Sequence, residues 1–434
     1  AITSLAMGAM NAATTHLGPQ TVSLTFVTGT LNQVGSHLAL AMRGIPLAES
    51  EFKNDEFDRD IWVDLLKGYV IHLDKFNRSS EAKSFLSDIG LRDVEDAIEF
   101  LVKAGEWAED EDPVMKRFSI RDDFPDGVMA EARALLSGDP AIDGFEDHTG
   151  LEVFSVDDEA TDDVDDALSI EDTDDGFIVG IHIAHVASQV EKWSALDSEA
   201  ARRGETIYLP EKRIHMFPPE LVSGRLSLLE NTHRSSLSLF VTVDGGMNIK
   251  KYRFANTLLN ISENMSYEHG SRYFENDPSG IKLMEFSEEL RKKRVENGAF
   301  LIQLPQLKVT VDDNLEISVE KNFMDTTAHR VVAEMMILMN RLAGRFLKEN
   351  DIPAVYRSQP EDISDDARTL DRDDPLYALN VIKYLRAPRV GLDPAPHKSL
   401  GIDYYTQITS PIRRYSDLVM QRQISSHIVS GETV

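Results

Sequence analysis

The acidic stretch at residues 157–166 constrains this chain more than any other feature of its sequence. Its ten residues, DDEATDDVDD, include seven carboxylates and no lysine or arginine. Like charges this close repel one another, so a folded chain must either leave them in water or bring positive charge to them. The stretch therefore predicts either a solvated acidic loop or a site for divalent cations.

Four of these aspartates follow the spacing D-x5-D-x-DD directly before the apolar segment ALSI. They are Asp157, Asp163, Asp165 and Asp166. Carboxylate oxygens suit Mg²⁺ or Mn²⁺. Two such ions about 4 Å apart can activate a water and stabilise a leaving oxygen in phosphodiester hydrolysis. The spacing alone leaves the acidic loop and the metal site both open.

A second charged stretch, SPIRRYSDL at residues 410–418, places Arg413 and Arg414 directly after Ser410 and Pro411. We expect Pro411 to start a helix. Arginines are unfavourable in the first turn of a helix because of the helix dipole. Guanidinium groups can, however, hold a phosphate in bidentate fashion and neutralise its developing charge. The two arginines therefore favour an anionic ligand.

The composition limits the remaining classes of protein. The length of 434 residues fits two or three domains. The absence of cysteine excludes disulfides, thiolate zinc sites and a cysteine nucleophile. It also fits a reducing compartment, and we expect a cytoplasmic protein. The net charge of −29 argues against a general affinity for nucleic acids, but local patches of charge decide binding.

Three segments of the chain differ in character. Residues 1–46 are an apolar, Ser- and Thr-rich segment of unknown role, whose first 42 residues lack Asp, Glu, Lys and Arg. This segment fits a buried or partner-covered helix, a membrane-derived piece or a fusion boundary. Residues 47–140 show helical spacing, with Gly105 as a predicted helix cap. A hairpin at 106–120 would make them a winged-helix domain; a generic helical cap is the equal alternative.

Residues 141–434 alternate between predicted strands and helices. We expect strands at 176–186, 235–244 and 306–311, where β-branched and apolar residues gather. We expect a long helix at 329–350, since its apolar residues recur at helical spacing. The sequence therefore predicts an α+β domain after the helical one.

The two charged stretches together resemble the ribonuclease II/ribonuclease R (RNB) family of 3′→5′ exoribonucleases. The resemblance runs from about Asp147 to Ile424 in seven ordered blocks: DHTGLEVFSVDDEATDDVDDALSIE, GIHIAHVASQV, ETIYLPEKRIHMFPPEL, LSLLENTHRSSLSLFVTVD, HRVVAEMMILMNRLA, VYRSQP and APHKSLGIDYYTQITSPIRRYSDL. It implies an α+β catalytic domain with a deep channel for single-stranded RNA. It also implies Mg²⁺-dependent hydrolysis that releases nucleoside 5′-monophosphates by a two-metal mechanism, with Mn²⁺ as a substitute ion.

The resemblance assigns roles to individual residues. Asp157, Asp163, Asp165 and Asp166 match the four active-site aspartates of the family, with Asp165 most closely tied to the chemical step. Arg413 matches the arginine that contacts the scissile phosphate, and Arg414 beside it is expected to bind RNA. Tyr208 matches an aromatic residue that clamps the terminal base, and Tyr267 matches another tyrosine that contacts RNA.

Some features depart from the family pattern. His185 stands where an aspartate is expected, and we do not interpret His182 and His185 as a metal pair. The family's final catalytic helices, which carry a further acidic residue, are expected beyond Val434. Either the catalytic domain is truncated at its C-terminus or its active site is completed in another way.

Two functions remain open from the sequence. The first is an exoribonuclease acting on single-stranded RNA, and the second is an RNA-binding protein of the same fold that does not cut. We expect no DNA partner and a monomer. We expect no membrane association, except that residues 1–42 leave this question open.

Overall fold

The computed structural model describes residues 59–88, 91–108, 111–138, 142–159, 161–209, 212–302, 306–311, 317–322, 325–359, 367, 370 and 377–433. The segment predicted at 1–46 lies outside these residues. The chain divides into a helical unit that ends at Asp123 and a barrel unit that begins at Phe124. The sequence placed this boundary near residue 140.

The helical unit contains α3 (Arg59–His72), the short η1 (Leu73–Lys75), α4 (Ser79–Asp88), α5 (Val94–Lys103) and α6 (Pro113–Arg117). Leu65, Leu66 and Leu101 are fully buried in its core. Asp93 caps α5 by accepting a hydrogen bond from the backbone N–H of Asp96. Gly105 follows the helix with φ of +72°, which confirms its predicted role as a cap.

The hairpin predicted at 106–120 is wrong, and with it the winged-helix interpretation. Residues 113–117 form the helix α6 instead, and no strand occurs among the described residues of the helical unit. The carboxylate of Asp112 accepts a hydrogen bond from the backbone N–H of Val114, and Pro113 occupies the first helical position. A capping aspartate followed by proline is a helix start signal, and it overrides the weak strand pattern.

The barrel unit is built on a closed barrel with the strand order β1-β2-β3-β6-β7. Its strands are β1 (Glu146–Asp157), β2 (Asp166–Thr173), β3 (Gly176–Ala184), β6 (His233–Asp244) and β7 (Ile249–Ser266). Neighbouring strands pair antiparallel, except that β1 and β7 pair parallel and close the barrel. Small two-stranded pairs lie outside it: β4 (Ile207–Tyr208) with β5 (Arg213–Ile214), β8 (Gln306–Val311) with β9 (Ile317–Asn322), and β10 (Tyr356–Ser358) with β11 (Arg389–Gly391).

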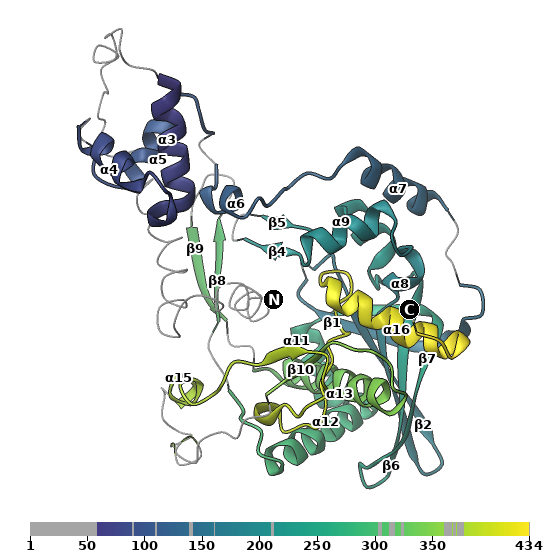
Figure 1. Ribbon diagram of the computed structural model, residues 1–434. Helices are drawn as coiled ribbons and strands as arrows, with labels where there is room; N and C mark the ends of the chain where they lie inside the picture. The colour runs from purple at the N-terminus through teal and green to yellow at the C-terminus, as the bar shows by residue number, and fades with distance from the viewer. Residues whose placement is uncertain are drawn as a thin grey trace. The chain divides into compact units, whose positions relative to one another are not determined.

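Helices cover the barrel (Figure 1). They are α7 (Asp126–Ser137), α8 (Val186–Gln189), α9 (Ala195–Arg203), α10 (Pro219–Leu221) with η2 (Val222–Leu226), α11 (Tyr267–Asn276), α12 (Pro278–Glu296), α13 (Thr327–Glu349) and α16 (Tyr415–Ser430). The unit also contains α15 (Tyr377–Ile382) and the short η3 (Lys398–Leu400). The helices α11, α12 and α13 pack against one another, and α16 packs against α8 and β7. The helix α7 packs against α9, with Val128 and Ala132 in the same core as the barrel.

The predicted α+β fold is confirmed. The predicted helix at 329–350 corresponds to α13, and the predicted strands correspond to β3, β6 and β8. The buried side of α13 packs into the largest core together with residues of the barrel strands. A period of 3.6 residues in α13 and runs of buried apolar residues in the strands explain why the sequence predicted these elements.

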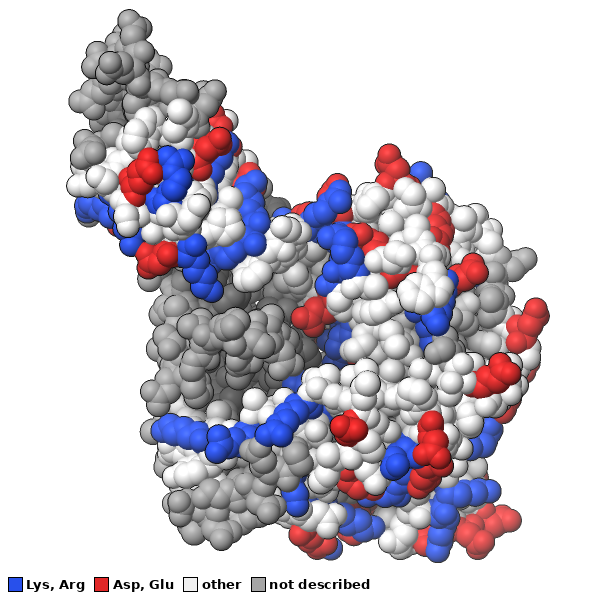
Figure 2. All heavy atoms as spheres, viewed as in Figure 1, with Lys and Arg blue, Asp and Glu red and all other residues white. Residues whose placement is uncertain are grey.

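No helix of the described residues is long and apolar enough to cross a membrane. The face shown in Figure 2 carries lysines and arginines among its acidic residues, although the net charge of the chain is −29.

Candidate active site

The acidic stretch forms the connection between β1 and β2 at one end of the barrel. Asp157 is the last residue of β1 and Asp166 is the first residue of β2. The stretch does not behave as one solvated loop. Asp158 and Glu159 are exposed. Asp157 and Asp166 are half-buried, and Asp163 and Asp165 are buried, with Asp165 only 3% exposed. Burial of like charges favours the metal-site interpretation over the solvated loop.

Asp165 joins the two charged stretches. Its Oδ1 accepts a hydrogen bond from the backbone N–H of Ile412 at 3.0 Å, and its Oδ2 accepts one from Nε of Arg413 at 3.1 Å. Its backbone carbonyl accepts a further bond from the N–H of Ala184, the last residue of β3. Segments 247 residues apart in sequence therefore meet at this carboxylate.

Charge and burial act in opposite directions at this pair. Burial raises the pKa of Asp165 to about 8, although the neighbouring Arg413 acts to lower it. Burial also acts to lower the pKa of Arg413, but Asp165, Tyr208 and Asp163 outweigh this effect and raise it. A second bond, from Nη2 of Arg413 to Oγ of Ser410 at 2.9 Å, fixes the guanidinium plane. The arginine remains charged and held in place.

Asp163 is paired with Tyr208. The tyrosine hydroxyl donates a hydrogen bond of 2.6 Å to Oδ2 of Asp163. Tyr208 lies on β4, opposite Arg213 of β5, whose guanidinium is 5.8 Å from the centre of the tyrosine ring. Burial, and then the charge of Asp163, raises the pKa of the Tyr208 hydroxyl. The tyrosine predicted to clamp RNA therefore lies in the site and donates a hydrogen bond to one of its carboxylates.

The negative charges of Asp157 and Asp166 have no ion-pair partner among the described residues. Asp157 accepts hydrogen bonds from the backbone N–H of Asp158 at 2.8 Å and from the hydroxyl of Thr161 at 3.0 Å. The carboxylate of Asp166 has no hydrogen-bond partner among the described residues. Burial, and then the charge of Asp157, raises the pKa of Asp166 to about 7. Burial, and to a smaller extent the charge of Asp163, raises the pKa of Asp157 as well.

Tyr267 begins α11, immediately after the end of β7. Its ring stacks on that of His329, with centres 3.7 Å apart and planes at 6°. Burial raises the pKa of Tyr267, and the charges of Asp157 and Asp166 raise it further, which places the ring beside these aspartates. Sequence reasoning missed His329; its only signal was its position next to Thr326, which caps α13.

The structure corrects one expectation about the second charged stretch and adds a contact for Arg414. Pro411 does not start a helix, because α16 begins at Tyr415. The guanidinium of Arg414 does not join Arg413 at Asp165. It bonds through Nε and Nη2 to the buried carboxylate of Asp417, at 3.1 and 2.6 Å. Arg414 is therefore held by an internal ion pair.

The two histidines form no metal pair. The ring of His182 lies between the hydroxyls of Ser169 and Ser238, and burial lowers its pKa to about 3. Nδ1 of His185 accepts the backbone N–H of Ser188, so its Nε2 donates to Asn256, and burial lowers its pKa to about 4. Both rings are neutral and bonded within the protein.

Among the described residues, no group of three or more Asp, Glu or His side chains converges closely enough to hold a metal ion. The contacts above explain this. Asp165 and Asp163 are turned to Arg413 and Tyr208, which leaves Asp157 and Asp166 as the carboxylates that form no ion pair. The donor set matches the chemistry of Mg²⁺, but its members are not gathered around one point.

Comparisons with known proteins identify the family of this chain. The model of the RNB domain matches residues 145–430. An uncharacterised ribonuclease of Synechocystis is 33% identical over 352 residues, covering 77% of this chain and 52% of the relative. Ribonuclease R of Mycoplasma genitalium in complex with ribose-methylated single-stranded RNA superposes with a TM-score of 0.67 at 23% identity, covering 74% of this chain and 57% of that one.

A yeast pseudonuclease also shares the fold, with a TM-score of 0.56 at 17% identity over 68% of this chain and 41% of that one. At these identities the solved structures show the fold alone. The chain spans about half the length of the curated relatives that it matches. The match of the RNB model over most of the barrel unit, with both charged stretches inside it, shows that this chain belongs to the RNB domain family.

Proposed function

We propose that this protein is a 3′→5′ exoribonuclease that hydrolyses single-stranded RNA to nucleoside 5′-monophosphates in a reaction that requires Mg²⁺. The observation that carries the proposal is the ion pair of Asp165 and Arg413, with three further aspartates beside it. Membership of the RNB family supports the substrate, and the match to relatives named ribonuclease R supports the reaction.

Arg413 is the group best placed to bind the scissile phosphate. Its Nε is bonded to Asp165 and its Nη2 to Ser410, while its Nη1 has no hydrogen-bond partner among the described residues. A guanidinium fixed on two sides presents its remaining donors in a defined direction. Such a donor can stabilise the charge that develops on a phosphate in the transition state.

The two tyrosines would hold bases on either side of the reacting phosphate. Stacking on a tyrosine face needs no particular base, so it suits an enzyme that degrades many sequences. Tyr267 presents one face to His329, which leaves the other for a base. Tyr208 is tied through its hydroxyl to Asp163, which orients its ring.

Mg²⁺ is the proposed cofactor, with Mn²⁺ as a substitute. The residues fit it in their chemistry, because they are oxygen donors whose buried charges raise each other's pKa. Asp157 and Asp166 would hold the ion. Asp163 would join them on exchanging its contact with Tyr208, and Asp165 would join them while it keeps its bond to Arg413. The bound ions would neutralise the carboxylates, activate water and stabilise the leaving oxygen.

The test uses a 5′-labelled single-stranded RNA. With Mg²⁺ we expect a descending ladder of products that each retain the label, and with EDTA we expect intact RNA. Thin-layer chromatography of a uniformly labelled RNA should show nucleoside 5′-monophosphates. Cleavage that continues in EDTA would exclude the aspartates as a metal site. Immediate release of the label as a mononucleotide would show that degradation starts at the 5′ end, and would exclude the 3′→5′ direction.

A second function has its own support. No described group of three ligands converges on a metal, and a pseudonuclease shares the fold. A protein that grips RNA without cutting it would retard the labelled RNA in a native gel and leave its length unchanged in Mg²⁺ and in Mn²⁺. The ladder assay therefore separates the two functions in one experiment.

A further inference from the structure

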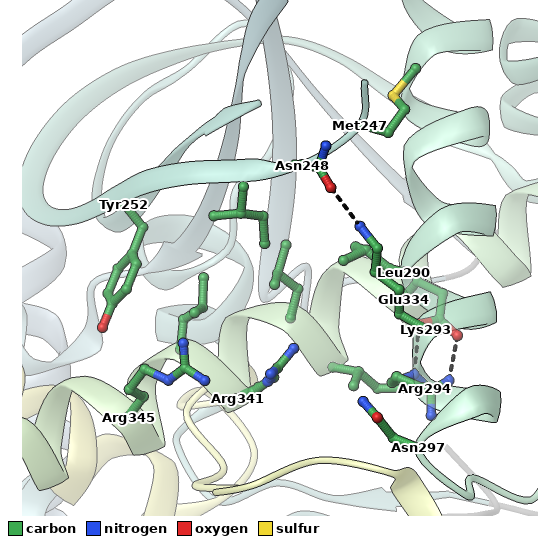
Figure 3. Close-up of a pocket in the computed structure, with 14 residues that line it drawn as sticks. Met247, Asn248, Tyr252, Leu290, Lys293, Arg294, Asn297, Glu334, Arg341 and Arg345 are labelled. Carbon is green, nitrogen blue, oxygen red and sulfur yellow. Dashed lines mark hydrogen bonds and ion pairs between the residues drawn. The ribbon is translucent and has the colours of Figure 1, made fainter. Parts of the chain in front are cut away.

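A cationic cavity of about 300 Å³ lies between α12, α13 and the turn that joins β6 to β7 (Figure 3). Its charged lining residues are Lys293, Arg294, Arg341, Arg345 and Glu334, and its polar ones are Asn248, Asn297 and Tyr252. Leu290, Leu338 and Leu342 supply part of an apolar wall. A cavity of this size is at the lower end of those that hold small organic ligands.

The cationic cavity is separate from the aspartates. Arg341 lies twelve residues after His329 on α13, which at 1.5 Å per residue is about 18 Å along the helix. His329 stacks on Tyr267 beside the aspartates, so it marks the end of α13 nearest to them. Neither charged stretch of the sequence supplies a lining residue. The proposed nuclease reaction therefore gives this cavity no role.

The charges of the cavity are only partly balanced. Arg294 and Glu334 form a buried ion pair with two hydrogen bonds, and a third bond joins Arg294 to the carbonyl of Leu400. Arg341 and Arg345, one helical turn apart, share the single carboxylate of Asp403. Among the described residues Asp403 alone bonds to these two guanidiniums, and the charge of Glu349 acts on Arg345 as well.

Several donors of this wall have no partner. Arg341 donates to Asp403 through Nε and Arg345 donates to it through Nη2. The other N–H groups of these two guanidiniums have no partner among the described residues. Lys293 bonds to the amide oxygen of Asn248 at 3.2 Å and lies 3.6 Å from Glu289. Glu349 is bonded to the hydroxyl of Tyr252, at 3.4 Å, rather than to an arginine. The unpaired guanidinium N–H groups suit the oxygens of a phosphate.

The remaining lining residues suit a flat ring. The ring of Tyr252 is half-buried, and the apolar side chains lie between it and α12. The side-chain amide of Asn297 is exposed and has no hydrogen-bond partner among the described residues. Asn297 lies at the opposite end of the cavity from Tyr252 (Figure 3). An inorganic anion would use only the arginines.

We propose that the cationic cavity binds a nucleoside 5′-monophosphate, with the phosphate on Arg341 and Arg345 and the base against the ring of Tyr252. The choice of this ligand class rests on the proposed function, which releases such molecules. The binding itself does not depend on catalysis, so the protein can bind the nucleotide even if it has no nuclease activity.

The test is isothermal titration calorimetry of the full chain with AMP in EDTA, where the aspartates hold no metal. Arg341→Gln should weaken AMP binding about tenfold, since it removes a charged donor to the phosphate. Tyr252→Leu should weaken it several-fold, because the base loses the aromatic face on which it stacks. Lys348→Gln is the matched control, because it also removes one unit of positive charge, from an exposed position on the same helix outside the cavity.

Each outcome decides the proposal. Weaker binding in both variants at unchanged melting temperature, with Lys348→Gln like the parent, supports it. No heat of binding at millimolar AMP overturns it, and so does equal binding by all variants, which would place AMP elsewhere. Inorganic phosphate binding as tightly as AMP would overturn the assignment of the base. RNA cleavage measured in parallel reports on the proposed function alone.

Discussion

The aspartate cluster (Asp157, Asp163, Asp165 and Asp166) and the cationic cavity treat buried charge in opposite ways. In the cavity, the most buried cation, Arg294, is matched by an equally buried carboxylate, Glu334. In the aspartate cluster, four carboxylates have only the guanidiniums of Arg413 and, at 3.7 Å, Arg213. A buried pair that neutralises itself belongs to the scaffold, whereas unmatched charge favours a ligand of the opposite sign.

The difference separates structural charges from functional ones within one barrel unit. The pair of Arg294 and Glu334, like that of Arg414 and Asp417, holds segments together. Burial raises the pKa of both Asp157 and Asp166, and their carboxylates form no ion pair among the described residues. Substitutions of the first kind should therefore change stability, and those of the second kind should change chemistry.

The largest effect is expected for Asp165→Asn. An asparagine can present only one acceptor, so it cannot satisfy both the N–H of Ile412 and Nε of Arg413. We expect turnover of single-stranded RNA to fall by about four orders of magnitude, roughly 5 kcal/mol at 1.36 kcal/mol per factor of ten. Single-turnover cleavage and filter binding measure the rate and the RNA affinity, which should change little.

Asp158→Asn is the matched control for this substitution. Asp158 belongs to the same acidic stretch but its side chain is exposed, so we expect turnover close to that of the parent. A comparable loss in both variants would mean that the total charge of the stretch matters and not the buried position. Near-normal turnover of Asp165→Asn would refute its assignment.

Arg294→Met tests the structural side of the comparison. It leaves Glu334, only 5% exposed, without its counter-ion. Breaking a buried pair in this way costs about 3–5 kcal/mol. Urea unfolding should show this loss in the free energy of unfolding, and the double variant Arg294→Met, Glu334→Leu should recover most of it. A loss of less than about 1 kcal/mol would mean that water reaches the pair.

The sequence predicted the aspartate cluster but not the cavity, and the reason is topological. Asp157 and Asp166 flank a single connection between two paired strands, so their proximity in space follows from proximity in sequence. The cavity takes Tyr252 from β7, Lys293 from α12 and Arg341 from α13. Only the packing of these elements brings them together, and their spacing in the sequence carries no signal.

Long periodic elements were predicted correctly, but the start of α16 was not. The backbone N–H groups of Arg413 and Arg414 both bond to the carbonyl of Ser410, which makes a turn. The carbonyl of Arg413 then accepts the N–H of Thr206, and the N–H of Tyr415 donates to Gly204. Pairing with a distant segment replaces the first helical turn that Pro411 predicts, and a tertiary contact of this kind is not visible in local sequence.

Arg413→Ala and Arg414→Ala should separate chemistry from structure at adjacent positions. Loss of Arg413 removes the donor proposed to face the phosphate and should cost about 3 kcal/mol in turnover. Arg413→Lys should not restore it fully, since a point charge lacks the guanidinium fork. Arg414→Ala should instead lower the melting temperature, because it leaves the buried Asp417 unpaired. If Arg414→Ala slowed turnover as much as Arg413→Ala and left the melting temperature unchanged, the role of Arg414 would not be its ion pair with Asp417.

Tyr208→Phe asks whether the hydroxyl matters apart from the ring. The hydroxyl donates to Asp163, which is 7% exposed, so phenylalanine leaves that carboxylate short of a partner. Without metal we expect a loss of roughly 1.5–3 kcal/mol in the free energy of unfolding, the usual range for a bond to a charged group. Mg²⁺ should reduce the loss by compensating the same charge. A loss that Mg²⁺ leaves unchanged would show that the ion does not reach Asp163.

The smallest effect concerns the pH dependence of stability in EDTA. In the folded protein, burial and Asp157 raise the pKa of Asp166 from its usual acidic value to about 7. The folded state thus retains a proton that the unfolded chain has already lost, so stability falls as pH rises through this pKa. The buried histidines act in the opposite sense, but their lowered pKa confines their effect to pH values below about 6.5.

Between pH 6.5 and 8 the aspartate cluster should therefore dominate the slope. We expect the free energy of unfolding to fall by about 1 kcal/mol over this window for Asp166 alone. Asp166→Asn, which cannot ionise, should flatten the curve, and saturating Mg²⁺ should flatten that of the parent, because the ion stabilises the charged carboxylate. The exposed Asp158 is again the control: Asp158→Asn should keep the parental slope. A parent whose stability rises with pH in EDTA would show that the carboxylates of the cluster are already compensated without an ion.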